Sequence, residues 1–136
     1  MWSIEHSLET DASPESIWRE WVDVERWPEW NRDIQRIELR GPFAPGSTIA
    51  MTLHGDETVE LRIAEAHESE SFVDEAEVEG TVVRTTHRVE RLGEGRARVV
   101  YRLEAAGPAA EQVGPVVSAD FPEVIAALVE RAGASD

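Results

Sequence analysis

The chain has 136 residues, of which 41% are hydrophobic and 30% are charged, a composition that fits one globular domain with its own core. It contains no cysteine, so neither a disulfide framework nor a cysteine-based zinc site can form. The formal net charge is -15, and all 13 basic side chains are arginines. Such a charge repels nucleic acid and anionic membranes, because both bind through basic side chains. We therefore expect a single domain over residues 1–136 without a nucleic-acid partner.

The N-terminal residues show neither the basic region nor the apolar core of a signal peptide. No apolar run approaches the roughly 20 residues that a membrane-spanning helix needs. These observations predict a cytoplasmic protein with no membrane span. The sequence leaves open whether the protein forms a homodimer.

The first predicted element is a half-buried strand over residues 2–9, in which polar and apolar side chains alternate. A helix is expected over residues 14–22, because Ser13 suits the N-cap and a proline occupies the first helical position. Residues 24–30 form a second short helical piece, which Pro28 either shortens or breaks.

From residue 34 onward the two-residue period returns and predicts six further strands. They are expected at residues 34–40, 48–53, 58–66, 72–78, 81–92 and 96–106. The connections are short and rich in turn-forming residues, which is typical of an antiparallel meander.

The last two of these strands predict a defined register. If residues 93–95 form a three-residue loop, Leu92 pairs with Arg96. On the outer face this register pairs opposite charges, Glu90 with Arg98 and Arg84 with Glu104, which supports it. On the inner face it pairs Val89 with Val99 and His87 with Tyr101.

Residues 113–128 switch to helical spacing and carry one broad apolar stripe, within which Pro122 predicts a kink or a break. Such a stripe must be buried on the sheet, and a strongly twisted seven-stranded sheet curls around it. The order of elements thus predicts an α+β fold. Its parts are a curved seven-stranded antiparallel sheet, two short helices after the first strand and a long C-terminal helix.

Residues 10–18, together with 21–23, 27–28 and 30–31, resemble the opening signature of the polyketide cyclase/dehydrase and lipid-transport superfamily (SRPBCC). These are the START-like, birch-pollen-allergen-like proteins, and the resemblance extends over essentially the whole chain. It implies the helix-grip fold, in which the sheet and the closing helix enclose a cavity. It does not specify an activity, because the superfamily includes carriers, cyclases, hydrolases and partner-binding domains. The proline-interrupted final helix departs from the long unbroken helix of many members.

His87 and Tyr101 are the candidate catalytic residues, because they interrupt otherwise apolar, inward-facing rows. Facing cross-strand neighbours have Cβ atoms roughly 4.5–5.5 Å apart. An imidazole and a phenol at that separation can polarise a ligand carbonyl or act as a general acid/base couple. They can equally hydrogen-bond each other or a water, because buried polar groups need partners. The sequence does not decide between these roles.

Asp74 shares an alternating row with two apolar residues, so its carboxylate lies either near the cavity with a raised pKa or at a solvated sheet edge. Asp120 lies beside the helical stripe and reaches either the cavity mouth or solvent. The remaining predicted ligand contacts are Trp27, Trp30, Thr85, Val99 and Phe121. No two histidines have the spacing of a metal site, and no glycine-rich phosphate loop is present, so neither a metal nor a cofactor is expected.

Three functions remain open from the sequence. The first is binding or carriage of a small hydrophobic molecule, such as a polyketide, lipid or isoprenoid, in an internal cavity. The second is an enzyme of the cyclase/dehydratase type, with His87 and Tyr101 as acid and base and Asp74 as a third group. The third is a protein-interaction domain whose acidic surface meets a basic partner.

Overall fold

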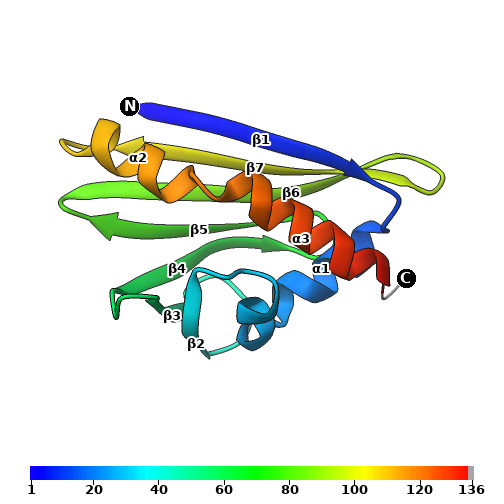
Figure 1. Cartoon of the computed structure of the whole chain (residues 1–136), viewed down its shortest axis with the longest axis horizontal. Coiled ribbons are helices and arrows are strands. Elements are labelled where there is room, and N and C mark those ends of the chain that lie inside the picture. The colour runs from blue at the N-terminus through cyan, green and yellow to red at the C-terminus, as the bar shows by residue number, and fades with distance from the viewer. Residues whose placement is uncertain (135–136) are drawn as a thin grey trace.

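The computed structural model describes residues 1–134, which form one curved sheet with helices on its concave face (Figure 1). The elements in chain order are β1 (Trp2–Thr10), α1 (Pro14–Val22), the 3-10 helix η1 (Val24–Glu29), β2 (Ile34–Arg40), β3 (Thr48–Leu53), β4 (Thr58–His67), β5 (Ser71–Val78), β6 (Thr81–Gly93), β7 (Arg96–Ala106), α2 (Ala110–Ser118) and α3 (Phe121–Ala134). The predicted strands and both short helices are confirmed, with ends that shift by a residue or less.

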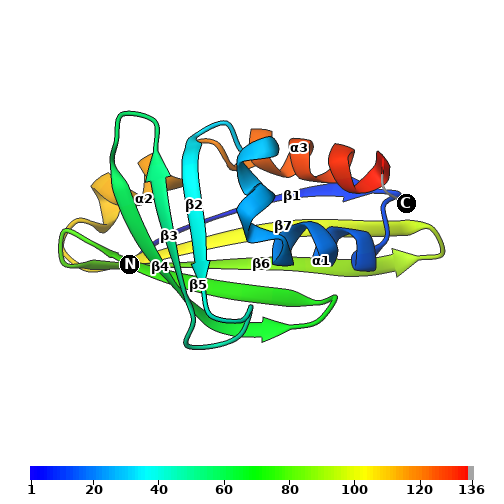
Figure 2. The same cartoon turned by 90° about the horizontal axis from the view of Figure 1, so that it is seen from below.

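The seven strands lie in the order β1-β7-β6-β5-β4-β3-β2, and all neighbouring pairs are antiparallel. The predicted seven-stranded antiparallel sheet is therefore confirmed. The two edge strands, β1 and β2, are consecutive in sequence, and α1 and η1 connect them. In Figure 2, β2, β3 and β4 cross the direction of β1, β7 and β6, so the sheet bends around α1 and α3.

The predicted β6–β7 register is confirmed from Arg84 opposite Glu104 to Glu90 opposite Arg98, with His87 opposite Tyr101. Only the end of the hairpin differs. Gly93, and not Leu92, pairs with Arg96, and a bulge between residues 91 and 93 absorbs Leu92. Two residues, 94 and 95, form the turn, and the positive φ of Gly95 (74°) suits such a tight hairpin.

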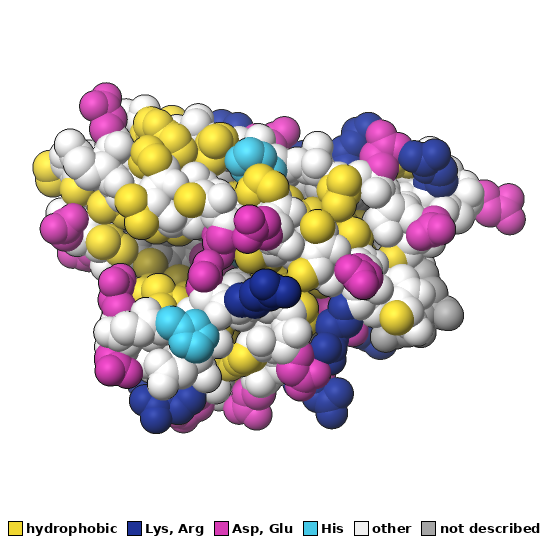
Figure 3. Space-filling view, in the orientation of Figure 1, with side chains coloured by type: hydrophobic (Ala, Val, Ile, Leu, Met, Phe, Trp, Pro, Cys, Tyr) yellow, Lys and Arg dark blue, Asp and Glu magenta, His cyan; other side chains and the backbone are white. Residues whose placement is uncertain are grey.

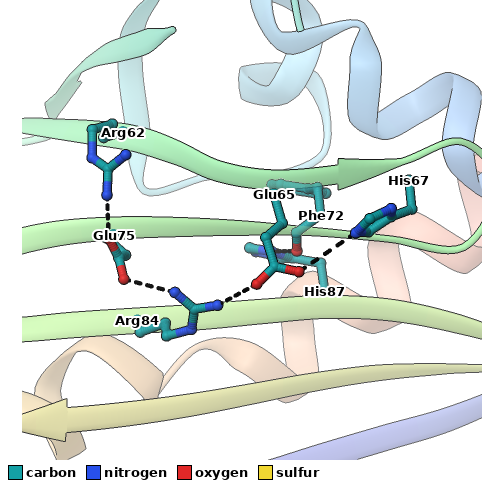
Figure 4. A network of polar contacts seen from close by, with 7 residues as sticks. All are labelled: Arg62, Glu65, His67, Phe72, Glu75, Arg84 and His87. Atoms are coloured by element: carbon teal, nitrogen blue, oxygen red, sulfur yellow. Dashed lines mark hydrogen bonds and ion pairs between the residues drawn. The ribbon is translucent and has the colours of Figure 1, made fainter. Parts of the chain in front are cut away.

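A chain of ion pairs crosses the outer face of β4, β5 and β6 (Figure 4). Glu75 accepts hydrogen bonds from Arg62 at 2.6 Å and from Arg84 at 2.7 Å, and Arg84 also donates to Glu65 at 2.6 Å. The hydrogen bond from Arg84 lowers the pKa of Glu75. Arg84 of β6 thus pairs with these two carboxylates and also lies opposite Glu104 of β7. Exposed pairs contribute little individually, but this network marks the face of the strands that meets water.

Helix α1 begins as the sequence predicts. The backbone N–H of Ser16 donates to the Ser13 hydroxyl at 3.1 Å, so Ser13 is the N-cap, and Pro14 occupies the first turn. Pro28 lies inside η1, which remains a short 3-10 helix of six residues.

The C-terminal helix is divided into α2 and α3, which confirms the predicted interruption (Figure 1). Pro122 is the second residue of α3, where its missing N–H breaks no helical hydrogen bond. The start of α2 is attached to β6, because the Ala109 N–H donates to the Thr81 hydroxyl at 2.8 Å. The end of α3 is attached to α1 and η1, because Arg131 contacts Glu20 at 2.6 Å and Glu29 at 2.8 Å.

Among the described residues, 110–134 form one helical stretch whose length and composition alone would suffice to cross a membrane. Charged side chains, among them Asp120 and Glu123, interrupt this stretch, so it is not a continuous apolar run. In the structure the stretch is interrupted between α2 and α3, and its apolar stripe packs on the sheet. Its buried hydrophobic residues include Val113, Val124, Ile125 and Leu128.

Gly114 in α2 packs directly against the Trp2 ring of β1, where a Cβ atom would overlap the indole. We expect Gly114→Ala to lower the free energy of unfolding by about 1–3 kcal/mol, because helix and strand must move apart. Gly133→Ala in α3 is the matched control, since nothing lies within 4 Å of its Cβ position, and it should be neutral or stabilising. Urea denaturation measures both. Equal effects of the two substitutions would contradict the close packing.

Candidate ligand-binding cavity

A cavity of about 640 Å³ lies between the concave face of the sheet and the helices. Strands β2 to β7 supply its floor, and residues of α1, η1, α2 and α3 surround it. Figure 3 shows a recess with hydrophobic side chains inside and acidic side chains near its edge. Cavities that bind small molecules commonly measure about 300–1,000 Å³ and have mainly apolar walls. The size and lining of this cavity therefore suit a small organic ligand.

The structure brings seven of the eight predicted ligand contacts into the cavity wall. They are Trp27, Trp30, Asp74, Thr85, His87, Tyr101 and Phe121. Val99 is the exception, because it is fully buried in the core and does not line the cavity. It lies in β7, two residues from Tyr101 in the direction of the β6–β7 hairpin. The inward-facing side chain of Val99 therefore packs against other core side chains and not against the cavity.

Many further lining residues are absent from the predicted set, and Trp21, Asp33 and His54 are among them. Trp21 is fully buried in the core and also lines the cavity. His54 is exposed and lies at the edge of the cavity. Asp120 lies in the lining, which is the cavity-mouth alternative of the two that the sequence left open. In the sequence, the only indication that Asp33 and His54 could lie near the cavity is that each is adjacent to the end of a predicted strand.

His87 is held between two rings. Its imidazole stacks on Phe72 with centroids 3.9 Å apart, and the Tyr101 ring meets its edge at 4.6 Å. Its Nδ1 lies 3.3 Å from the carbonyl oxygen of Phe72 (Figure 4). A carbonyl only accepts, so Nδ1 carries the proton and Nε2 remains an acceptor. Burial lowers the pKa of His87 to about 3, so the imidazole is neutral at pH 7.

The Tyr101 hydroxyl accepts a hydrogen bond from the indole N–H of Trp21 at 3.1 Å. His87 and Tyr101 therefore have separate partners and do not bond to each other. Burial raises the pKa of Tyr101, which keeps the phenol neutral. Among residues 1–134, no group accepts the hydroxyl proton, and the indole N–H of Trp30 has no acceptor. The hydroxyl proton of Tyr101 is thus available to a ligand, whereas the Trp30 nitrogen is itself fully buried.

Asp74 is the most unusual group in the cavity, because its carboxyl is 6% exposed and accepts no hydrogen bond from any residue of the described chain. The nearest basic atom is His87 Nε2, at 3.9 Å from Oδ2. Desolvation, and secondarily the charge of Glu75, raise the pKa of Asp74 to about 7. At neutral pH this carboxyl can therefore either accept or release a proton.

A second carboxyl pair lies where α2 meets α3. Burial and a hydrogen bond with Asp33 raise the pKa of Asp120 to about 7. Two carboxyl groups at hydrogen-bond distance share a proton, because both cannot ionise cheaply. Asp33 lies in the loop before β2, and Asp120 lies between α2 and α3. Both line the cavity, so their hydrogen bond joins these two segments at the cavity wall.

The chain belongs to the polyketide cyclase/dehydrase and lipid transport family, whose family model matches residues 1–133. This confirms the resemblance noted in the sequence. No curated protein matches the chain by sequence.

Solved structures of START-like and birch-pollen-allergen-like proteins share the fold. A point mutant of norcoclaurine synthase from Thalictrum flavum, bound to a transition-state analogue, superposes with a TM-score of 0.79 at 16% identity, over 96% of this chain and 93% of that one. Ara h 8.0201 gives 0.78 at 16% identity, over 98% of each chain. A START superfamily protein from Mycobacterium smegmatis gives 0.76 at 17% identity, over 98% of this chain and 99% of that one. At such identities the likeness shows the helix-grip fold alone.

Replacing Asp74 by Asn should stabilise the protein at high pH. The folded carboxyl keeps its proton up to about pH 7, against 3.8 for the ordinary group. The stability that the folded protein gains by holding this proton is therefore fully present below pH 3.8 and is lost as the pH rises through about 7. At about pH 8 we expect Asp74→Asn to raise the free energy of unfolding by about 2–4 kcal/mol, and at about pH 4 to change it little. Urea denaturation at both pH values measures this.

Glu77→Gln is the control for this experiment, because Glu77 is an exposed carboxylate on the same strand. It should show no such dependence on pH. His87 acts with the opposite sign, because its lowered pKa gives stability above about 6.5 that is lost as the pH falls toward about 3. An Asp74→Asn variant that is equally affected at both pH values would show that the carboxyl is solvated.

Proposed function

We propose that the protein binds or carries a small hydrophobic molecule, of polyketide, lipid or isoprenoid type, inside the cavity. The observation that carries this proposal is the cavity itself, with a volume of about 640 Å³ and walls that are mainly aromatic and aliphatic. Membership of a family described by polyketide cyclases and lipid transport supports it. A norcoclaurine synthase structure of the same fold, solved with a transition-state analogue, also supports it.

The polar groups of the wall would orient such a ligand. Tyr101 offers an unused donor, and Asp74 offers a carboxyl that receives no hydrogen bond from the described residues. Buried polar groups that lack partners cost free energy until they are satisfied. A ligand with one acceptor and one donor placed to meet these groups would recover that cost, while its apolar body contacts the rings. A few fixed polar groups in an apolar wall are the usual basis of ligand specificity.

Filling the cavity should abolish binding. Ala76 is a half-buried lining residue of β5, so Ala76→Phe places a ring in the open space. We expect the neutral dye Nile red to bind the unaltered protein and the Ala76→Phe variant at least about tenfold more weakly. Ala106→Phe, at an exposed position of β7, is the matched control and should bind normally. Failure of the unaltered protein to bind Nile red, and absence of any ligand by native mass spectrometry, would contradict the proposal.

The second candidate function is an enzyme of the cyclase/dehydratase type. The observation that favours it is the convergence of His87, Tyr101 and Asp74 on one cavity. Neutral His87 offers an acceptor, neutral Tyr101 offers a donor, and Asp74 exchanges a proton near pH 7. Enolisation or dehydration of a carbonyl compound requires a base for the proton next to the carbonyl and a donor for the oxygen. Asp74 would act as the base and Tyr101 as the donor, with His87 as a relay.

If a ligand recovered from the cavity is converted by the protein, the assignment has a direct kinetic test. Tyr101→Phe removes only the hydroxyl and should lower kcat by about tenfold or more, because the developing oxyanion loses its donor. His87→Gln should also lower kcat. Circular dichroism spectra would show whether the variants stay folded. Full turnover by both folded variants would remove these residues from the chemistry.

A further inference from the structure

The charged residues that line the cavity, apart from its histidines, are all acidic. Its lining contains five acidic residues and, among the described residues, no arginine. The acidic residues are Asp33, Glu57, Asp74, Glu79 and Asp120. All 13 basic side chains of the protein are arginines, and they lie elsewhere, many of them in ion pairs on the outer face of the sheet. A carboxylate or phosphate ligand would therefore enter the cavity without a counter-charge, which is costly in an apolar site.

Asp74 supplies a second observation, independent of the count of acidic residues. It is buried, it lines the cavity, and no described residue donates a hydrogen bond to its carboxyl. His87 cannot act as its cation, because the Phe72 carbonyl holds the neutral tautomer and the two groups lie 3.9 Å apart. Native proteins rarely leave a buried carboxyl without a donor. The donor must therefore come from the cavity, either as water or as a group of a bound ligand.

The remaining walls favour a cation as that partner. Six aromatic residues line the cavity: Trp21, Trp27, Trp30, Phe72, Tyr101 and Phe121. Aromatic ring faces attract ammonium groups, most strongly where water is excluded, and indole is the best of them. The carboxyl groups of Asp33 and Asp120 add negative potential at the junction of the two helices. A cleft with one sign of charge and apolar walls concentrates ligands of the opposite charge.

We propose that the cavity selects an apolar or aromatic amine, whose protonated nitrogen pairs with Asp74 while its body lies against the tryptophan and phenylalanine rings. This inference rests on the proposed function, and it specifies the chemical class of the ligand. A neutral alcohol would satisfy the carboxyl of Asp74 as a simple donor. It would not account for a lining in which five acidic residues face no arginine.

Three probes of one shape test this inference: 2-(1-naphthyl)ethylamine, 2-(1-naphthyl)ethanol and 1-naphthylacetate. They share the naphthalene body and carry a cationic, a neutral and an anionic end. Isothermal titration at about pH 8 keeps the amine protonated and the carboxyl ionised. We expect the amine to bind about tenfold or more tightly than the alcohol, and the acetate to bind most weakly, because the ammonium gains a charge-assisted bond.

Two variants assign the effect to one carboxyl. Asp74→Asn keeps the shape of the side chain and should bring the amine to within about threefold of the alcohol, with little change for the alcohol itself. Glu77→Gln removes the same charge from the exposed side of β5 and should leave the order of the three probes unchanged.

The outcomes separate this inference from the proposed function. If the alcohol or the acetate binds as tightly as the amine, the preference for amines is wrong, and the binding function stands. The preference is also wrong if Asp74→Asn leaves the advantage of the amine intact. If none of the three probes binds, both the function and the inference fail.

Discussion

Everything in the cavity depends on the pairing register of β5, β6 and β7. Side chains alternate between the two faces of a strand, so a slip of one residue would turn Asp74, His87 and Tyr101 outward. The same slip would bring arginines such as Arg84 into an apolar interior without partners. The ion pairs from Arg84 to Glu75 and Glu65 form only in the observed register. Weak surface interactions thus support the arrangement of a buried site.

Burial decides the charge state of each polar group inside. Desolvation is the largest cause of the pKa shifts of Asp74, His87 and Tyr101, and in each case it favours the neutral form. At neutral pH His87 and Tyr101 are therefore uncharged, whereas Asp74 is divided between its neutral and ionised forms. A buried group of this kind would become charged more easily if a ligand offset its desolvation cost with an opposite charge or a hydrogen bond. The chain can thus keep acid/base chemistry in an apolar space without the full cost of buried ions.

Much of this arrangement could be predicted from the sequence, because strand alternation carries it. Alternation and the charge pairs placed His87 opposite Tyr101, and alternation left two positions open for Asp74, of which the structure shows the one in the cavity wall. Other features had no local signal. The bulge at Leu92 is a backbone adjustment. Val99 faces inward, but the position of the helices, which the strand pattern does not give, decides that core side chains and not the cavity surround it. Asp33 and His54 come from strand ends, so tertiary packing alone brings them to the cavity.

The use of arginine as the sole basic side chain has a chemical consequence for this interior. A guanidinium does not form a stable imine with an aldehyde or ketone, whereas a lysine amine does. With no lysine in the chain, no side chain can trap a carbonyl compound covalently by condensation. A carbonyl compound inside the cavity could therefore not be held as an imine by any side chain of this protein.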